Sequence, residues 1–158
     1  MKLKSIITPK AIVTSLDATE RDAVVAELVD ALIDSGSADA SLREELIAMV
    51  LEREQKGSTG FGRGVAVPHV KHPSASSIHA AIGLSQAGVD FNALDRQPVY
   101  SIFLLLSPAD SPEEHLQAME VIFKNLSQET FRKFLRQADS ADDVLTLLDE
   151  ADSHQYTG

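Results

Sequence analysis

The chain has 158 residues, enough for one compact domain with a sizeable core. Apolar residues make up 44% and charged residues 24%, which excludes a disordered or fibrous chain. The net charge of −10 argues against nucleic-acid binding by counterion release and against docking on an anionic membrane surface. No apolar run approaches the roughly 18 residues of a membrane-spanning helix, so direct membrane insertion is not expected. The absence of cysteine excludes disulfides, thiolate catalysis and Cys-based zinc sites, and we expect a cytoplasmic protein.

The first part of the chain predicts one strand and two helices. Residues 10–16 (KAIVTSL) favour a short strand. Thr19 and Asp22 have the spacing of a capping box, and Gly36 is a suitable helix stop. The second helix has the same pattern at Ser41 and Glu44 and ends near Lys56. Between the start and stop signals, apolar residues recur at helical spacing, first as Val24, Val25, Leu28, Val29, Leu32 and Ile33, then as Leu42, Leu46, Ile47, Val50 and Leu51.

The middle of the chain predicts strands, and the last part predicts helices. Four glycines in residues 57–64 (GSTGFGRG) exclude a regular helix there. Short strands are expected at 65–67, which Pro68 closes, at 78–85 and at 98–106, with a short extra strand at 89–91. Segment 98–106 is apolar at nearly every position, which is typical of a central strand covered on both faces. Three further helices are expected to begin at Ser111, Ser127 and Ser140. Helices on both sides of a buried sheet indicate an α/β sandwich.

His69 is the histidine whose surroundings most favour chemistry. The glycine-rich loop, a short strand and Pro68 place its imidazole at a strand end. The loop offers backbone N–H groups and the hydroxyls of Ser58 and Thr59, which suit an anion. The loop has neither the Gly-Lys-Ser/Thr ending of a Walker loop nor a GxGxxG fingerprint before a helix, so nucleotide binding is disfavoured.

A neutral imidazole beside an anion-binding loop is suited to accepting a phosphoryl group. Arg53 and Arg63 are the candidate cations, with solvated surface arginines as the alternative. A zinc site of His69, His72 and His115 is a second alternative, but no acidic residue has the usual ligand spacing, so no metal is expected. A hydrolase is disfavoured because Ser58 has no neighbouring base and no nucleophile elbow occurs.

The run from residue 53 to residue 69, REQKGSTGFGRGVAVPH, closely resembles the signature of enzyme IIA domains of the fructose–mannitol class. These domains belong to the bacterial phosphoenolpyruvate-dependent sugar phosphotransferase system and include stand-alone nitrogen-regulatory members. The likeness continues in residues 88–95 (GVDFNALD), 104–108 (LLLSP) and 114–116 (EHL). It covers nearly the whole chain, in order and with the family's spacing.

The resemblance implies a three-layer α/β/α sandwich with a mixed sheet of four to five strands and helices on both faces. We expect one such domain over residues 1–152 and a frayed tail over 153–158. His69 matches the phosphorylated histidine, His115 the supporting histidine and Arg53 the arginine that stabilises phosphoryl charge. The loop that borders the phosphorylated ring is expected to consist of Gly57, Ser58, Thr59, Gly60 and Arg63.

The implied activity is that of a phosphotransferase component that forms a covalent phosphohistidine, needs no cofactor and turns over no small molecule by itself. The implied donor is the histidine-containing phosphocarrier protein, and the recipient is a sugar-specific acceptor domain or a regulatory target protein. A chain with one domain favours the stand-alone, nitrogen-regulatory type. The alternative is a regulatory protein-binding module that has lost phosphotransfer. The chain departs from the family pattern at Arg63, at Val70 and at the pair His72–Pro73, and these departures bear on which partner docks.

Overall fold

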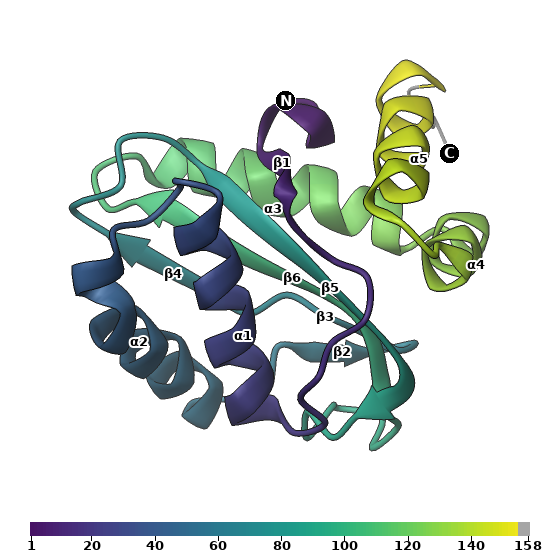
Figure 1. Ribbon diagram of the computed structural model, residues 1–158, viewed down its shortest axis with the longest axis horizontal. Helices are drawn as coiled ribbons and strands as arrows, with labels where there is room; N and C mark the ends of the chain where they lie inside the picture. The colour runs from purple at the N-terminus through teal and green to yellow at the C-terminus, as the bar shows by residue number, and fades with distance from the viewer. Residues whose placement is uncertain (155–158) are drawn as a thin grey trace.

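One mixed sheet of six strands organises the chain (Figure 1). The computed structural model describes residues 1–154. The strand order is β1-β5-β6-β3-β2, and β4 also pairs with β6. Pairs β1–β5, β3–β6 and β4–β6 are parallel, whereas β5–β6 and β2–β3 are antiparallel. The strands are β1 (Ile7–Val13), β2 (Gly60–Gly62), β3 (Val65–Ala66), β4 (His69–His72), β5 (His79–Val89) and β6 (Val99–Pro108).

Helices cover both faces of this sheet, which confirms the three-layer α/β/α architecture (Figure 1). Helices α1 and α2 pack on one face, and α3, α4 and α5 pack on the other. Two short 3-10 helices, η1 and η2, precede β1 and α2. The bounds are η1 (Leu3–Ser5), α1 (Arg21–Asp34), η2 (Ala40–Leu42), α2 (Arg43–Gln55), α3 (Pro112–Leu126), α4 (Glu129–Gln137) and α5 (Ala141–His154).

Strand β6 is the central strand that its continuous apolar sequence predicts. All of its residues except Tyr100 are buried. Ile102 and Leu104 contribute to the core beneath α1 and α2, while Phe103 and Leu105 contribute to the core beneath α3, α4 and α5. The alternation follows from the period of two in a strand, and it gives each face its own apolar core.

The sheet has six strands where four to five are expected, because part of the glycine-rich loop (β2) and residues 69–72 (β4) also form strands. Within this loop, β2 pairs with β3 through Gly60–Ala66 and Gly62–Val65. The turn between them needs three consecutive positive φ angles, at Gly62 (108°), Arg63 (60°) and Gly64 (79°). Glycine at two of these positions makes the hairpin possible.

Other strand boundaries differ from expectation. The first strand is β1 (Ile7–Val13) and not 10–16, because it pairs with β5 from Ile7 onward. No separate strand forms at 89–91: Val89 ends β5, and Asp90 makes a single bridge to Glu20.

Two of the predicted helix-end signals are confirmed and two are wrong. Gly36 follows the end of α1 with φ +81°, and Ser140 Oγ accepts the Asp143 N–H at 3.1 Å, both as expected. The capping box at Thr19 is absent, because Glu20 is the N-cap of α1 and makes no side-chain cap bond. In place of the capping box at Ser41, the Asp39 carboxylate accepts the Ser41 N–H at 2.9 Å.

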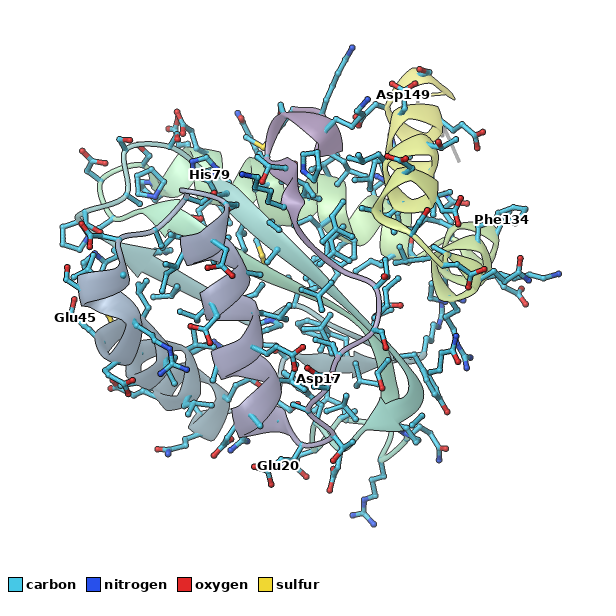
Figure 2. All side chains as sticks on the ribbon, viewed as in Figure 1. Asp17, Glu20, Glu45, His79, Phe134 and Asp149 are labelled. Carbon is cyan, nitrogen blue, oxygen red and sulfur yellow. The ribbon has the colours of Figure 1, made fainter. Side chains whose placement is uncertain are left out.

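The last two helices also depart in detail from the sequence patterns. Helix α4 follows Gln128 and not Ser127, and its Phe134 points away from the protein body (Figure 2). Helix α5 continues through Ser153 to His154, so these two residues are helical although the sequence predicts a frayed tail from residue 153. The rest of the expected tail, 155–158, lies outside the described residues.

The Asp152 side chain joins the two ends of the described chain. The Asp152 carboxylate accepts the N–H of Leu3 at 2.7 Å and that of Lys4 at 3.0 Å. Helix α5 thereby holds η1 against the sheet. Across residues 1–154, no helix is both long and apolar enough to span a membrane.

Candidate active site

His69 occupies the first position of β4, at an interruption between two strands that share a partner. Ala66 of β3 pairs with Ile102 of β6, and His69 pairs with Leu105 farther along the same strand. Between them, Pro68 has no N–H to donate, while its carbonyl accepts the Leu105 N–H at 3.0 Å. This break in the ladder leaves the His69 side chain half-buried.

The imidazole of His69 is fixed by the backbone two residues earlier. Its Nδ1 lies 2.9 Å from the carbonyl oxygen of Val67. A carbonyl oxygen only accepts, so this contact requires the proton on Nδ1 and leaves the Nε2 lone pair free in the neutral ring. Burial lowers the pKa of His69, the Val67 hydrogen bond opposes this, and the charge of Arg53 lowers the pKa further. The ring is therefore neutral near pH 7.

His115 on α3 lies beside His69. The ring centroids are 5.4 Å apart and the planes are tilted by 56°. The Nδ1 of His115 lies 2.7 Å from Ser107 Oγ, which is buried. Burial lowers the pKa of His115 to about 4, and the charges of His69 and Lys71 act in the same direction. His115 is thus also neutral near pH 7.

Arg53 and Lys71 bring positive charge to the histidine pair. Arg53 lies in the last turn of α2, where its Nη1 donates to the Gly57 carbonyl at 2.7 Å. Lys71 lies two residues after His69 on β4, so both side chains project from the same face of the strand. Lys71 is exposed, and its charge lowers the pKa of both histidines.

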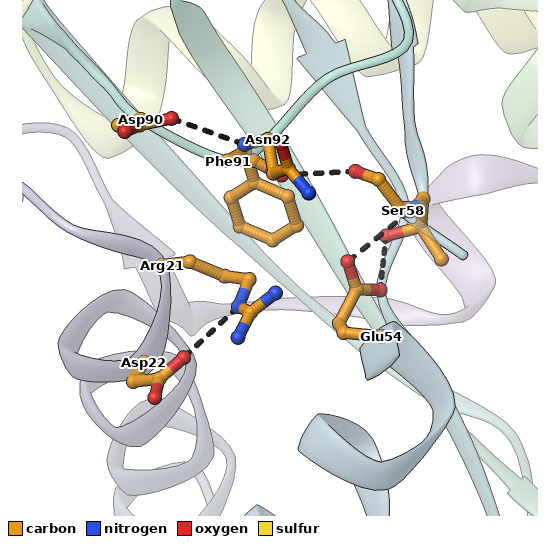
Figure 3. Close-up of polar contacts among 8 residues, drawn as sticks. Arg21, Asp22, Glu54, Ser58, Asp90, Phe91 and Asn92 are labelled. Atoms are coloured by element: carbon orange, nitrogen blue, oxygen red, sulfur yellow. Dashed lines mark hydrogen bonds and ion pairs between the residues drawn. The ribbon is translucent and has the colours of Figure 1, made fainter. Parts of the chain in front are cut away.

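Glu54 holds the glycine-rich loop in place (Figure 3). Its side chain is 3% exposed, and its two oxygens accept the Thr59 N–H at 3.1 Å and the Thr59 hydroxyl at 2.5 Å. Glu54 also raises the pKa of His69, against the effect of Arg53. The buried carboxylate therefore connects the loop to α2 and contributes negative charge to the site.

The polar groups of the loop that the sequence offers to an anion are hydrogen-bonded within the chain. The Ser58 hydroxyl donates to the Phe91 carbonyl at 2.9 Å (Figure 3). It also accepts the Gly60 N–H at 3.0 Å. Thr59 gives both its N–H and its hydroxyl to Glu54, and the Gly57 N–H donates to the Glu54 carbonyl. These groups shape the loop and are already bonded within the chain.

Arg63 lies away from His69, although the sequence predicts it in the loop beside that ring. It lies in the β2–β3 turn, its N–H donates to Asp95 Oδ2 at 3.0 Å, and its side chain faces α4. The structure thus brings together His69, His115 and Arg53 but separates Arg63 from them.

His72 points to the opposite side of β4 from His69. It is buried, its Nε2 contacts the carboxylate of Glu45 on α2, and its Nδ1 lies 2.6 Å from Ser74 Oγ. The three histidines of the zinc alternative therefore do not converge. Within residues 1–154, no group of three or more His, Asp or Glu side chains could hold a metal ion.

Sequence reasoning missed two charged residues of this site. Lys71 could have been found from strand alternation, because it stands two positions from His69. Glu54 carried no such signal, since its burial depends on how the loop folds back over α2.

Comparisons with known proteins agree with this geometry. Residues 5–151 match the family model described as phosphoenolpyruvate-dependent sugar phosphotransferase system, EIIA 2. A fructose-specific EIIABC component of this system from Bacillus subtilis is 31% identical over 152 residues, which are 96% of this chain and 24% of that protein. A nitrogen regulatory protein from Pseudomonas aeruginosa is 31% identical over 157 residues, 98% of this chain and 99% of that one.

A solved structure shows the same fold. The nitrogen regulatory protein IIA-Ntr from Neisseria meningitidis superposes with a TM-score of 0.82 at 29% identity, covering 91% of this chain and 97% of its own. The sequence resemblance is confirmed by the family match, the relatives and this fold. The chain belongs to the EIIA 2 family of the phosphoenolpyruvate-dependent sugar phosphotransferase system.

Proposed function

We propose that this chain is a phosphohistidine carrier in which Nε2 of His69 accepts a phosphoryl group from the histidine-containing phosphocarrier protein. The observation that carries the proposal is the 2.9 Å contact between His69 Nδ1 and the Val67 carbonyl, because it leaves Nε2 as the nucleophilic nitrogen. Family membership supports a role in phosphotransfer. The proposed relay works in the cytoplasm.

The transfer exchanges one phosphorus–nitrogen bond for another. The Nε2 lone pair attacks phosphorus, the bond to the donor's imidazole nitrogen breaks, and the electron pair leaves with the donor ring. His69 keeps its Nδ1 proton, so the phosphorylated ring is cationic, and the Val67 carbonyl stabilises that charge.

The neighbouring residues have separate roles in this proposal. Arg53 and Lys71 stabilise the negative charge of the phosphoryl group. The Ser107 hydroxyl lies 2.7 Å from Nδ1 of His115. In this proposal the hydroxyl donates to Nδ1, so the His115 proton is on Nε2, where it can donate to a phosphoryl oxygen. Both histidines are neutral before transfer, so neither electrostatically repels the other.

The surface next to His115 offers an apolar docking platform. Leu116, the next residue on α3, is 61% exposed. Phe61 of β2 is 43% exposed and packs edge-on against Phe123 of α3 with ring centroids 4.8 Å apart. An apolar centre combined with the chain's net charge of −10 favours a donor that has an apolar patch and a basic rim.

The recipient is a sugar-specific acceptor domain or a regulatory target. Likeness to a nitrogen regulatory protein over nearly the full length of both chains supports the regulatory type. In that case the phosphoryl group changes the affinity for a target, because it adds roughly two negative charges beside the apolar platform.

Intact-mass analysis tests the proposal after incubation with phosphoenolpyruvate, enzyme I and the phosphocarrier protein. We expect one acid-labile phosphoryl group on the wild type, none on His69→Gln, and one on the control His79→Gln. His79 is a suitable control because it lies at the start of β5 and is also partly buried. Full labelling of His69→Gln would show that another residue is the acceptor. An unlabelled wild type beside a labelled reference IIA domain would favour a binding module without phosphotransfer.

A further inference from the structure

A basic groove separates the β2–β3 turn from α4. Its volume is about 560 Å³, and it is lined by Arg63, Arg132, Lys133 and Arg136 together with Glu129 and Gln137. Figure 1 shows β2 ending on the side of the sheet where α4 lies. Four cationic side chains and one carboxylate give the groove a local excess of three positive charges, in a chain whose net charge is −10.

The arginines of the groove are held in place by contacts of their own. Arg132 Nη1 donates to the Leu126 carbonyl at 2.7 Å, and the Arg136 guanidinium lies 3.7 Å from the centroid of the Tyr100 ring. The backbone of Arg63 is fixed by its bond to Asp95. None of the four cations forms an ion pair with another residue of the described chain.

This groove is separate from the site of His69. Next to the Arg63 turn, the N–H groups of Tyr100 and Ser101 on β6 donate to the Gly64 carbonyl, whereas His69 pairs with Leu105. At about 3.3 Å per residue, the two positions are roughly 15 Å apart along β6. Any ligand of the groove is therefore distinct from the phosphoryl group on His69.

We propose that the groove binds a small molecule that carries clustered phosphate groups, such as a diphosphate. One guanidinium group can donate two parallel hydrogen bonds to a phosphate group. Arginine side chains that are already ordered before binding lose less entropy when the ligand binds. The groove has the size of a small-molecule site, which is roughly 300–1,000 Å³. The net charge of −10 repels an extended acidic protein face, whereas a small anion experiences mainly the local positive charge.

An NMR titration of the ¹⁵N-labelled protein with inorganic pyrophosphate at low salt tests this site. We expect saturable shifts at the amides of Arg63, Gly64 and α4, and weaker binding of inorganic phosphate. The double variant Arg63→Gln, Arg136→Gln should bind pyrophosphate at least about tenfold more weakly. Arg96→Gln is the matched control, because Arg96 is also an exposed turn residue with a positive φ (61°) and does not line the groove.

Lys133→Gln gives a second test if the double variant loses its native spectrum. Lys133 is exposed, and its loss should weaken binding by a smaller factor. Three results would overturn the proposal: no saturable shift in the groove up to about 10 mM pyrophosphate, equal weakening in Arg96→Gln, or equal affinity for phosphate and pyrophosphate. An acidic peptide that binds the groove more tightly than pyrophosphate would show that its partner is a protein.

Discussion

The rings of His69 and His115 lie 5.4 Å apart, although one residue begins β4 and the other lies near the start of α3. Two imidazolium ions at this distance in a partly buried site would repel each other. Burial lowers the pKa of each ring, and the charge of His69 lowers the pKa of His115 further. The pair is therefore neutral over the physiological range, which keeps a lone pair available for transfer.

Phosphorylation of His69 should slow as the solution becomes acidic. A proton on Nε2 removes the nucleophilic lone pair, and the pKa of His69 is lowered from its ordinary value of 6.5. The rate should therefore fall to half of its plateau only below about pH 6.5. Initial rates from the phosphorylated donor measure this, with a second IIA domain as the control for titration of the donor. A rate that already halves near pH 7 would contradict a lowered pKa.

The phosphoryl group should be attached to Nε2 of His69. The Val67 carbonyl occupies Nδ1 at 2.9 Å, so attack through Nδ1 would require this bond to break. Nitrogen-15 NMR of histidine-labelled, phosphorylated protein distinguishes the two ring positions. Signals of Nδ1-phosphohistidine would show that the His69 ring flips and breaks its bond to Val67 before transfer.

His115 should make stability fall as the pH decreases. Unfolded, it has the ordinary pKa of 6.5, and folded it has a pKa of about 4, so the unfolded state binds more protons between these values. Its contribution is present above pH 6.5 and is lost as the pH falls toward 4, by up to about 3 kcal/mol. Urea unfolding across this range should show a shallower decline for His115→Gln than for the wild type. Parallel curves would mean that the ring is protonated in the folded protein.

Replacing Glu54 should destabilise the fold. In Glu54→Gln an NH₂ group replaces one of the two carboxylate oxygens that accept from Thr59. Either the N–H or the hydroxyl of Thr59 is then a buried donor without an acceptor. We expect a loss of about 1–3 kcal/mol in the free energy of unfolding. Glu52→Gln on the exposed side of α2 is the control and should change it little. Equal urea midpoints for the two variants would contradict this role of Glu54.

Arg53 should set the pKa of His69 through its charge. Because Arg53 lowers that pKa, Arg53→Gln should raise it, and Arg53→Lys should leave it closer to the wild-type value. An NMR titration of the His69 ring measures both. An unchanged pKa in Arg53→Gln would mean that its guanidinium acts only on the Gly57 carbonyl.

The sequence predicted elements whose stabilisation is local or periodic. Apolar spacing located α1 and α2, and the continuous apolar run located β6 as the central strand. Gly36 and Ser140 marked helix ends because their effects depend on neighbouring backbone alone. The prediction of a capping box at Thr19 was wrong because the N-cap of α1 is Glu20, which has an extended conformation and also bridges to Asp90.

The histidine site was predictable only where a family pattern supplied the long-range contacts. The approach of His115 to His69 depends on how α3 packs on the sheet, and a single sequence does not reveal it. The hydroxyls of Ser58 and Thr59 look available in the sequence, but Glu54 and the Phe91 carbonyl bind them in the fold. Arg63 lies near His69 in sequence and beside α4 in space, because the β2–β3 hairpin turns it away.

The distribution of the two cores along the chain has a consequence for synthesis from the amino terminus. Every buried residue of the core under α1 and α2 precedes residue 107 in the chain. The core under α3, α4 and α5 includes Leu3 and also Ala151, and its closing contact is the Asp152 carboxylate. A nascent chain can therefore bury one face of its sheet once β6 has left the ribosome. The other face stays open to chaperones until the last helix emerges.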